Sequence, residues 1–344
     1  MPSILFLMIS LTRLLALILT MIFGMSAVYA TGAIHATQSS SANAQFVDEQ
    51  QCLRCHENAA KHWQSSHHAK AMQPANDKTV LGHFDGQTFT DSGVSSRFFR
   101  KAGRYFIHTE GETGEYADFE VKYTFGVYPL QQYLLALPKG RLQAFTVAWD
   151  VQKQRWFDLY PNEKISVNDP LHWTKRGFTA NSSCIDCHTT NMQLKFDVAK
   201  GDYHTSWDAV NVGCQACHGN GSLHLAWAES QATAQGLAHS SSQSPVQVVQ
   251  APSSASNNSN NSNNSKNKQD NKGLLVNYND LDSQAVTEIC ARCHSRRTPI
   301  STNYTLGDSY LDHFMPELLR QDRYHADGQI LDEVFVYGSF TQSK

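Results

Sequence analysis

The sequence predicts an α+β fold that consists mostly of short helices and loops, with one inserted antiparallel β module. Three observations lead to this prediction. A C-x-x-C-H pattern occurs four times, in segments with little apolar periodicity. Residues 84–160 contain no cysteine and carry aromatic and β-branched runs separated by turn residues. Residues 228–272 are rich in Ser and Asn with few apolar side chains, which predicts a disordered insertion.

The overall composition does not indicate a charged partner. The chain has 344 residues, enough for one large domain or two ordinary ones, with 28 Lys and Arg against 31 Asp and Glu. Because there is no basic excess, we expect no nucleic-acid partner. The 16 histidines are more informative, since histidine is a common metal ligand.

The N-terminus is typical of an exported protein. Residues 1–30 combine Arg13, the apolar run LLALILTMIFGM and small residues around Ala30, which predicts a signal peptide. The apolar run is also long enough for an uncleaved membrane anchor, and that alternative stays open. Residues 31–47 are expected to form a flexible linker. Both alternatives place the folded part outside the cytoplasmic membrane, in the periplasm.

All eight cysteines belong to the C-x-x-C-H motifs. We number these motifs 1 to 4 in chain order: Cys52, Cys55 and His56; Cys184, Cys187 and His188; Cys214, Cys217 and His218; Cys290, Cys293 and His294. Disulfides would fit an exported chain, and C-x-x-C pairs can build zinc sites, but neither requires the adjacent histidine. Covalent haem attachment does, because two thiols add to the haem vinyl groups and the histidine becomes an iron ligand.

The regularity of the pattern favours haem attachment over chance. A histidine following all four C-x-x-C pairs by accident has odds on the order of 10⁻⁵. One helical turn would bring both sulfurs of a motif to the same porphyrin edge. The sequence therefore predicts four haem c groups, with the histidine of each motif as the proximal iron ligand. No nucleophile elbow, P-loop or H-E-x-x-H motif is present.

The motifs divide the chain into segments. We expect a first haem segment at 48–83, a β-rich module of five or six strands at 84–160, a two-motif segment at 161–227, the insertion at 228–272 and a fourth haem segment at 273–344. Asp48 with Gln51 resembles a helix-capping pair, and the lack of Gly and Pro up to Met72 predicts a helix there. A short helix is expected before motif 4. The final residues carry no terminating signal, so the fourth segment is read as truncated.

Other histidines are candidates for the second axial ligand, which an electron-transfer haem usually takes from His or Met. The candidates are His68, His67, His224, His204, His172, His313 and His325. His67 and His68 rank first because they follow the predicted helix of motif 1, and His224 follows His218 across a GNGS turn.

The remaining histidines, two methionines and a basic cluster have simpler interpretations. His35, His62, His83, His108 and His239 are expected to be structural or solvent-exposed, and Met72 and Met192 are thioether alternatives that would more commonly pack in a core. Arg97, Arg100, Lys101 and Arg104 form a basic cluster, which indicates either contact with haem propionates or an ordinary solvated face.

A family resemblance rests on CLRCH with HWQSSHHAKAM, VKYTFGVYPLQQYLLALPKGRLQAFTVAWD, CIDCHTTNM, VGCQACHGNGSLH, CARCHSRR and YHADGQI. Together these stretches resemble exported multihaem cytochromes c whose longer members carry C-terminal tetratricopeptide repeats. A looser resemblance extends to the nitrifier tetrahaem cytochrome and hydroxylamine oxidoreductase superfamily. The resemblance covers residues 50–225 and 280–340 and implies periplasmic electron transfer. Haems whose motifs are close in sequence are expected to stack edge to edge, so the fold is expected to surround stacked haems. The Asn/Ser insertion departs from the family pattern.

Three functions fit the sequence. The favoured one is an electron carrier that passes single electrons through bis-His haems between redox partner proteins, with membrane quinol or cytochrome components as candidates. A second is an oxidoreductase acting on a small nitrogen or sulfur compound at one open haem, with His172, His204, Asp186 and Asp208 as candidate acid or base groups. A third is a haem-bearing scaffold for partner docking. An electron carrier with no substrate of its own is the expectation.

Overall fold

The computed structural model describes residues 44–234, 271–301, 304–318, 320–321, 323–331 and 335–342. The predicted signal peptide, His35, His239 and most of the Ser/Asn-rich insertion lie outside these residues. Within the described ranges, no helix combines the length and apolar character needed to cross a membrane.

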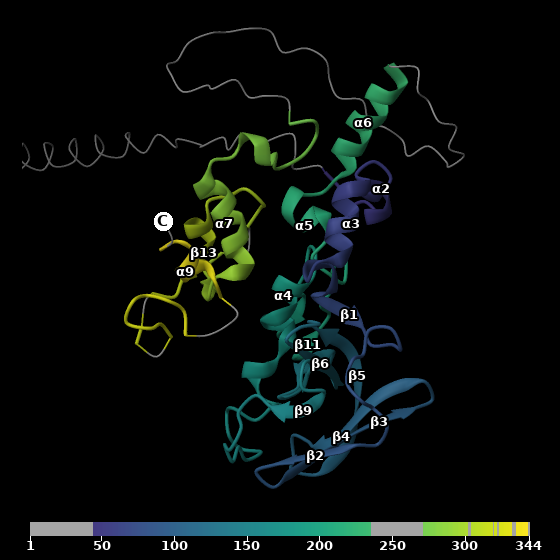
Figure 1. Ribbon diagram of the computed structural model, residues 1–344, viewed down its shortest axis with the longest axis vertical. Helices are drawn as coiled ribbons and strands as arrows, with labels where there is room; N and C mark the ends of the chain where they lie inside the picture. Colours follow the sequence, from purple (N-terminus) through teal and green to yellow (C-terminus); the bar gives the residue numbers. More distant parts are fainter. Residues whose placement is uncertain are drawn as a thin grey trace, which may run out of the picture. The chain divides into compact units, whose positions relative to one another are not determined.

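A nine-stranded antiparallel sheet is the largest element of the described chain (Figure 1). Its strands are β1 (Met72–Pro74), β2 (Thr88–Asp91), β3 (Val94–Lys101), β4 (Arg104–Glu110), β5 (Tyr116–Phe125), β6 (Leu130–Leu137), β7 (Arg141–Ala144), β8 (Val147–Asp150) and β9 (Arg155–Asp158). The strand order is β2-β3-β4-β5-β6-β8-β9, with β1 paired to β5 and β7 paired to β6. Two-residue turns with positive φ at both positions, such as Ala102-Gly103, close the tight hairpins.

The predicted β module is present, but the predicted number of strands is wrong. Eight strands, β2 to β9, lie between residues 84 and 160, where five or six were expected. The run RLQAFTVAWD is one reason, because it divides into β7 and β8 around Phe145 and Thr146. Apolar content continues through this break, since Phe145 is buried, so the run resembled a single strand.

The helices of the described chain are short. They are α2 (Glu49–Leu53), α3 (Glu57–Ser65), α4 (Cys184–His188), α5 (Cys214–His218), α6 (Ser222–Ala234), α7 (Ser283–His294), α8 (Tyr310–His313) and α9 (Tyr337–Phe340). Single 3₁₀ turns are η2 (His68–Lys70), η3 (Arg176–Phe178), η4 (Ala180–Ser182) and η5 (Tyr278–Asp280). Two small antiparallel pairs join β10 (Phe196–Asp197) to β11 (Asp202–Tyr203) and β12 (Arg297–Pro299) to β13 (Phe314–Pro316). The prediction that helices and loops make up most of the fold is therefore not supported.

The helix predicted from Asp48 to Met72 is present as α2 and α3, but it is broken at His56 and ends at Ser66. Asp48 does cap α2, where its side chain accepts a hydrogen bond from the Gln50 N–H at 2.8 Å. The chain then leaves helical geometry at His56 (φ −113°, ψ 50°) and at Ser66 (ψ 164°). The Ser66 hydroxyl donates to the Trp63 carbonyl, a local bond that competes with helix continuation.

Two apolar clusters hold the sheet to the rest of the chain. The larger lies on one side of the sheet and centres on Phe84, whose ring meets Phe98, Tyr105, Tyr133 and Trp156 edge-on at 5.1–5.6 Å. The smaller cluster joins Phe125 and Leu134 of the sheet to Ile185, the second residue of motif 2. Because Ile185 is fully buried, α4 is anchored to the sheet through its own motif.

The predicted insertion begins later than expected. Residues 228–234, which were assigned to it, continue α6 to Ala234. The chain is described again from Asn271, and Gly273 (φ +75°) lies so close to α6 that an added Cβ would stand 2.5 Å from the Leu223 carbonyl oxygen. After the insertion the chain therefore returns to the first turn of α6.

Candidate haem-binding site

Each of the four motifs forms a turn of helix, as the sequence predicts. In motif 1 the His56 N–H donates to the Cys52 carbonyl at 3.0 Å, directly after α2. Motifs 2 and 3 form α4 and α5, and motif 4 ends α7. All eight cysteines carry free thiols, the form that reacts with haem vinyl groups. Among the described residues, no group of three or more His, Cys, Asp or Glu side chains converges to hold a bare metal ion.

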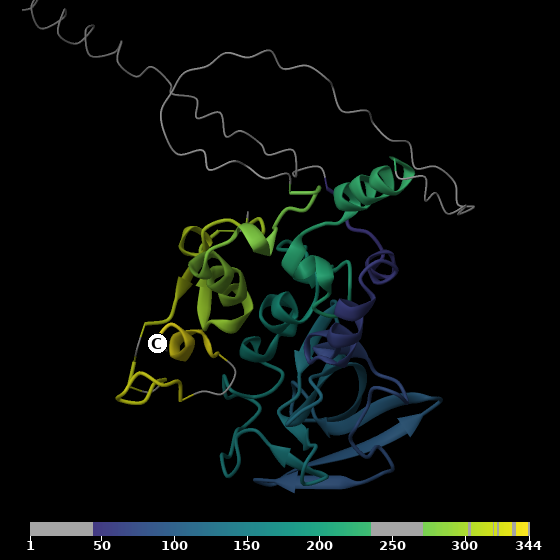
Figure 2. The ribbon, with the colours of Figure 1, turned by 45° about the horizontal axis from the view of Figure 1, so that its top comes forward.

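Motifs 1 and 3 lie against each other, as the views in Figures 1 and 2 both show for α2 and α5. The Cys214 N–H donates to the Glu49 carboxylate at 3.0 Å, and Gln215 exchanges hydrogen bonds with the backbone of Val47 at 2.7 and 3.0 Å. The Cys214 thiol also donates a hydrogen bond to Cys52, which lowers the pKa of Cys52 to about 7. We call this contact the 1–3 junction.

The histidine of motif 2 is fixed by the sheet. His188 Nδ1 lies 2.8 Å from the Ala71 carbonyl, which can accept its proton, and the Phe125 ring stacks on the imidazole at 4.3 Å. Burial lowers the pKa of His188, so the ring is held neutral, the form that binds iron. A backbone acceptor on Nδ1 leaves Nε2 as the free ligand atom.

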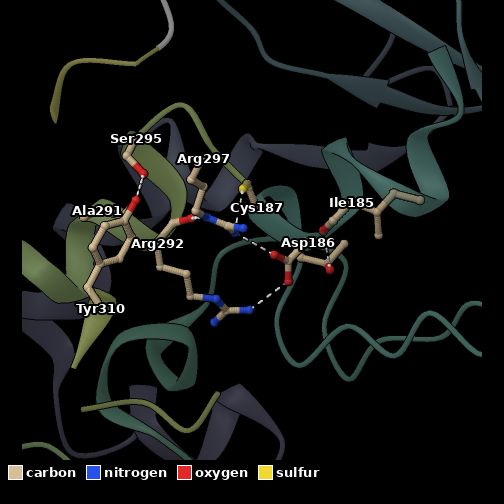
Figure 3. Close-up of polar contacts among 9 residues, drawn as sticks. Ile185, Asp186, Cys187, Ala291, Arg292, Ser295, Arg297 and Tyr310 are labelled. Carbon is tan, nitrogen blue, oxygen red and sulfur yellow. Dashed lines mark hydrogen bonds and ion pairs between the residues drawn. The ribbon is translucent and has the colours of Figure 1, made fainter. Parts of the chain in front are cut away.

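Motifs 2 and 4 meet at a charged contact, which we call the 2–4 junction. The carboxylate of Asp186, inside motif 2, pairs with Arg292, inside motif 4, at 2.9 Å and with Arg297 at 2.8 Å. Figure 3 shows both guanidinium groups directed at this carboxylate. The Cys187 thiol donates to Cys293, which lowers the pKa of Cys293 to about 7. Coulombic interactions of Cys217 with Cys290 and Cys293 show that motif 3 also lies near motif 4.

Two pairs of histidines from different segments face each other. The ring centroids of His68 and His294 are 6.0 Å apart, and those of His56 and His224 are 6.1 Å apart. Two metal–imidazole bonds of about 2 Å on opposite sides of one iron would separate the ring centroids by roughly 6 Å. Both pairs therefore have the spacing of two axial ligands of one haem, and each contains one motif histidine.

His224 is held by the chain that returns after the insertion. Its Nδ1 lies 2.8 Å from the Lys272 carbonyl, so the backbone accepts that proton and Nε2 is left free. The Trp227 ring stacks on the imidazole at 5.5 Å. Nearby, the Tyr278 hydroxyl donates to the Cys217 carbonyl at 3.2 Å, and its ring contacts His218.

The other predicted distal candidates lie in different surroundings. Like His68, the side chains of His67, His204 and His325 are exposed, but His67 lies beside Tyr128 rather than beside a motif histidine. His313 Nε2 lies 3.4 Å from an Asp308 carboxylate oxygen. His172 is 5% exposed in the β module, where its Nδ1 lies 2.8 Å from the Thr174 hydroxyl. It borders a cavity of about 60 Å³ lined by Phe145, Trp173 and neighbouring strand residues.

The remaining candidates have ordinary partners. Met72 is fully buried and Met192 packs against the same cluster, so both sulfurs lie in an apolar core. His83 packs on Trp149 at 4.7 Å, His108 pairs with Asp118 at 2.8 Å, and His62 is exposed on α3. In the basic cluster, Arg100 pairs with Asp77 at 2.6 Å and Arg104 with Glu120 at 3.2 Å.

The residues present fit haem c. Paired thiols stand in helical turns with a histidine after each pair, and two further histidines lie at iron-bridging distance from motif histidines. Sequence reasoning missed Glu49, Arg297 and the Lys272 carbonyl, which act across segments far apart in the chain. The only signal for Arg297 is its place in the basic run RRT directly after motif 4, and a backbone carbonyl leaves no signal at all.

One protein-family match overlaps this site. The family described as cytochrome c554 and c-prime matches residues 51–88 and 148–219, which include motifs 1, 2 and 3. Among solved structures, the outer cell wall cytochrome OcwA is similar at 16% identity with a TM-score of 0.45; the alignment covers 79% of this chain and 45% of that one. No curated protein matches the chain. The family match therefore falls on segments that carry three of the four motifs, and it supports haem binding of the c type by those motifs.

Proposed function

We propose that the protein is a periplasmic tetrahaem cytochrome that carries electrons between redox partner proteins. The observation that carries the proposal is the two pairs of facing histidines, at 6.0 and 6.1 Å, because a second strong-field ligand makes an iron suited to electron transfer. When bound, haem c supplies a one-electron Fe³⁺/Fe²⁺ couple. The chain holds it with the four motifs and tunes it by ligation, burial and charge.

The ligand pairs link segments that are distant in sequence. His68, beside motif 1, would complete the iron of motif 4, and His224, beside motif 3, would complete the iron of motif 1. The segment from Cys52 to Met72 would thus contribute to two haems, through motif 1 to one and through His68 to the other. His224 and His68 are the distal ligands we propose from the sequence candidates.

The thiol contacts support a spatial order of the motifs that differs from their order in the chain. Cys52 contacts Cys214, Cys187 contacts Cys293, and Cys217 interacts with Cys290 and Cys293. Since each thiol marks a porphyrin edge, the proposed electron path follows motifs 1, 3, 4 and 2. Partners would then dock near motif 1 and motif 2, with membrane quinol or cytochrome components as candidates.

Low-temperature EPR of the purified holoprotein tests the proposal. Low-spin ferric signals with the g-values of bis-His ligation are expected, together with four haem-sized mass additions to the polypeptide. A high-spin signal that shifts on adding nitrite or hydroxylamine would favour an oxidoreductase instead. Fewer than four additions would contradict the tetrahaem assignment.

A further inference from the structure

We propose that the charged cluster Asp186–Arg292–Arg297 sets the reduction potentials of the haems held by motifs 2 and 4 above those held by motifs 1 and 3. The inference rests on the proposed function and adds a direction to it. Electrons that enter near motif 1 would move toward the 2–4 junction because reduction is more favourable there.

The cluster carries a net positive charge next to two motifs. Asp186 contributes one negative charge, and Arg292 and Arg297 contribute two positive charges, so the cluster has a charge of +1. Asp186 lies between the cysteines of motif 2 and Arg292 between those of motif 4. An Arg297 Nη2 is 3.9 Å from Cys187 Sγ, which places its charge beside the attachment point of motif 2 (Figure 3).

The cluster is poorly hydrated and rigidly held. The Arg297 side chain is 7% exposed, against 21% for Arg292 and 26% for Asp186. Arg297 also lies over the Phe314 ring at 4.0 Å and donates through Nε to the Arg292 carbonyl. Charges act more strongly where water is excluded, so a fixed +1 here influences nearby redox groups more than a surface charge would.

The sign of the effect follows from the electron. Reduction of Fe³⁺ to Fe²⁺ adds one negative charge to the haem, which a nearby positive charge stabilises, so the potential rises. The 1–3 junction has the opposite character, because the half-buried carboxylate of Glu49 contacts the N-terminus of motif 3, whereas Arg54, the arginine inside motif 1, is exposed and its charge is screened by water. The charge difference between the two junctions therefore raises the potentials of the haems at the 2–4 junction above those at the 1–3 junction.

Redox titration of the holoprotein, followed by absorbance and EPR, tests the inference with charge-removing variants. Arg297→Gln is expected to lower the two highest potentials by about 59 mV, which is a tenfold change in a one-electron equilibrium constant. Asp186→Asn leaves two uncompensated guanidinium groups and is expected to raise the same potentials. Glu49→Gln is expected to raise the two lowest potentials.

Arg296→Gln is the matched control. It removes the same charge one residue away, but Arg296 is paired with Glu317 at 3.2 Å, which compensates its charge, so a smaller shift is expected. If the cluster had only a structural role, Arg297→Gln and Asp186→Asn would shift the two highest reduction potentials in the same direction, because both would loosen the packing and increase hydration. Shifts of the same sign in these two variants, or no shift of the two highest potentials, overturn the inference. Unchanged lowest potentials in Glu49→Gln also overturn it.

The same experiment separates this inference from the proposed function. Loss of haem content or of low-spin signals in the parent protein contradicts the electron-carrier proposal itself. Intact haems and spectra with potentials that ignore these charges contradict only the proposed role of the cluster. Thermal unfolding of each variant identifies any that fail to fold.

Discussion

At the scale of single residues, the proposed electron transfer rests on the facing histidines. His56 and His224 are 168 positions apart in sequence, as the numbering shows, and their rings lie 6.1 Å apart. The His224 ring is fixed by the Lys272 carbonyl and by the Trp227 ring. A ligand held this way does not need to be reorganised when the iron changes oxidation state.

Replacing either distal ligand should therefore change one haem only. We expect His224→Ala to convert the low-spin haem of motif 1 to high spin, and His68→Ala that of motif 4, seen by EPR, with the haem count unchanged by mass spectrometry. His62→Ala, on the exposed side of α3, is the control and should leave the spectrum unchanged. An unchanged spectrum in both ligand variants would contradict the proposed pairs.

His172 gives a pH prediction at the same scale. Burial lowers the pKa of His172 below its ordinary value of 6.5. The unfolded chain therefore takes up a proton at higher pH than the folded chain, and the stability gained from the neutral ring is present above pH 6.5 and lost as the pH falls toward the folded pKa. Denaturant unfolding below pH 6.5 should show that the free energy of unfolding depends less on pH in His172→Gln than in the wild type. Equal pH slopes of this free energy would refute the prediction.

At the scale of elements, the helical motifs could be predicted from the sequence, but the contacts between distant segments could not. The four helical turns and the helix before motif 4 follow from local spacing, and the structure confirms them. The break at Ser66 depends on a side-chain bond to Trp63, and the ligand pairs depend on tertiary contacts, so neither has a local signature. His68 and His224 could be proposed as ligands from sequence, but their partners could not.

The return of the chain at Gly273 is one such tertiary contact, and it can be tested directly. In Gly273→Ala the new Cβ would lie 2.5 Å from the Leu223 backbone carbon and oxygen and 2.7 Å from the His224 backbone nitrogen. The φ of residue 273 is +75°, which a side chain rarely adopts. We expect a loss of about 1 to 3 kcal/mol of stability and a perturbed low-spin signal, because the Lys272 carbonyl would be displaced from His224.

Gly307→Ala supplies the matched control for that variant. Gly307 also has a positive φ, +95°, but its added Cβ meets only the Val276 side chain at 3.4 Å. It carries a similar backbone strain without the clash at the ligand. A stability loss and EPR change of equal size in both variants would show that strain, rather than the displaced carbonyl, is responsible.

At the scale of the whole molecule, two kinds of core support the chain. The sheet has a conventional apolar core around Phe84, Phe98 and Trp156. The motif segments have few buried side chains of their own, and α2 has none, which is consistent with packing completed by a porphyrin. Stability should therefore divide between a sheet that folds by itself and segments that depend on the prosthetic groups.

Hydrogen exchange can measure this division. In a variant with all eight cysteines changed to Ala, which cannot attach haem, amides of β4, β5 and β6 should stay protected. Amides of α2 and α5 should exchange far faster than in the holoprotein, because their packing partners are missing. Uniform loss of protection across the sheet would contradict an independently stable β module.

The thiol contacts at the two junctions have a consequence for how the protein is made. Cys52 lies in hydrogen-bond contact with Cys214, and Cys187 with Cys293, so a chain that folds before haem attachment holds thiols of different motifs together. Thiols in contact, one of them with a pKa near neutrality, are readily joined by an oxidant. Biogenesis must therefore keep these cysteines reduced, or attach haem while the junctions are still apart, because a cross-motif disulfide would block two attachment sites at once.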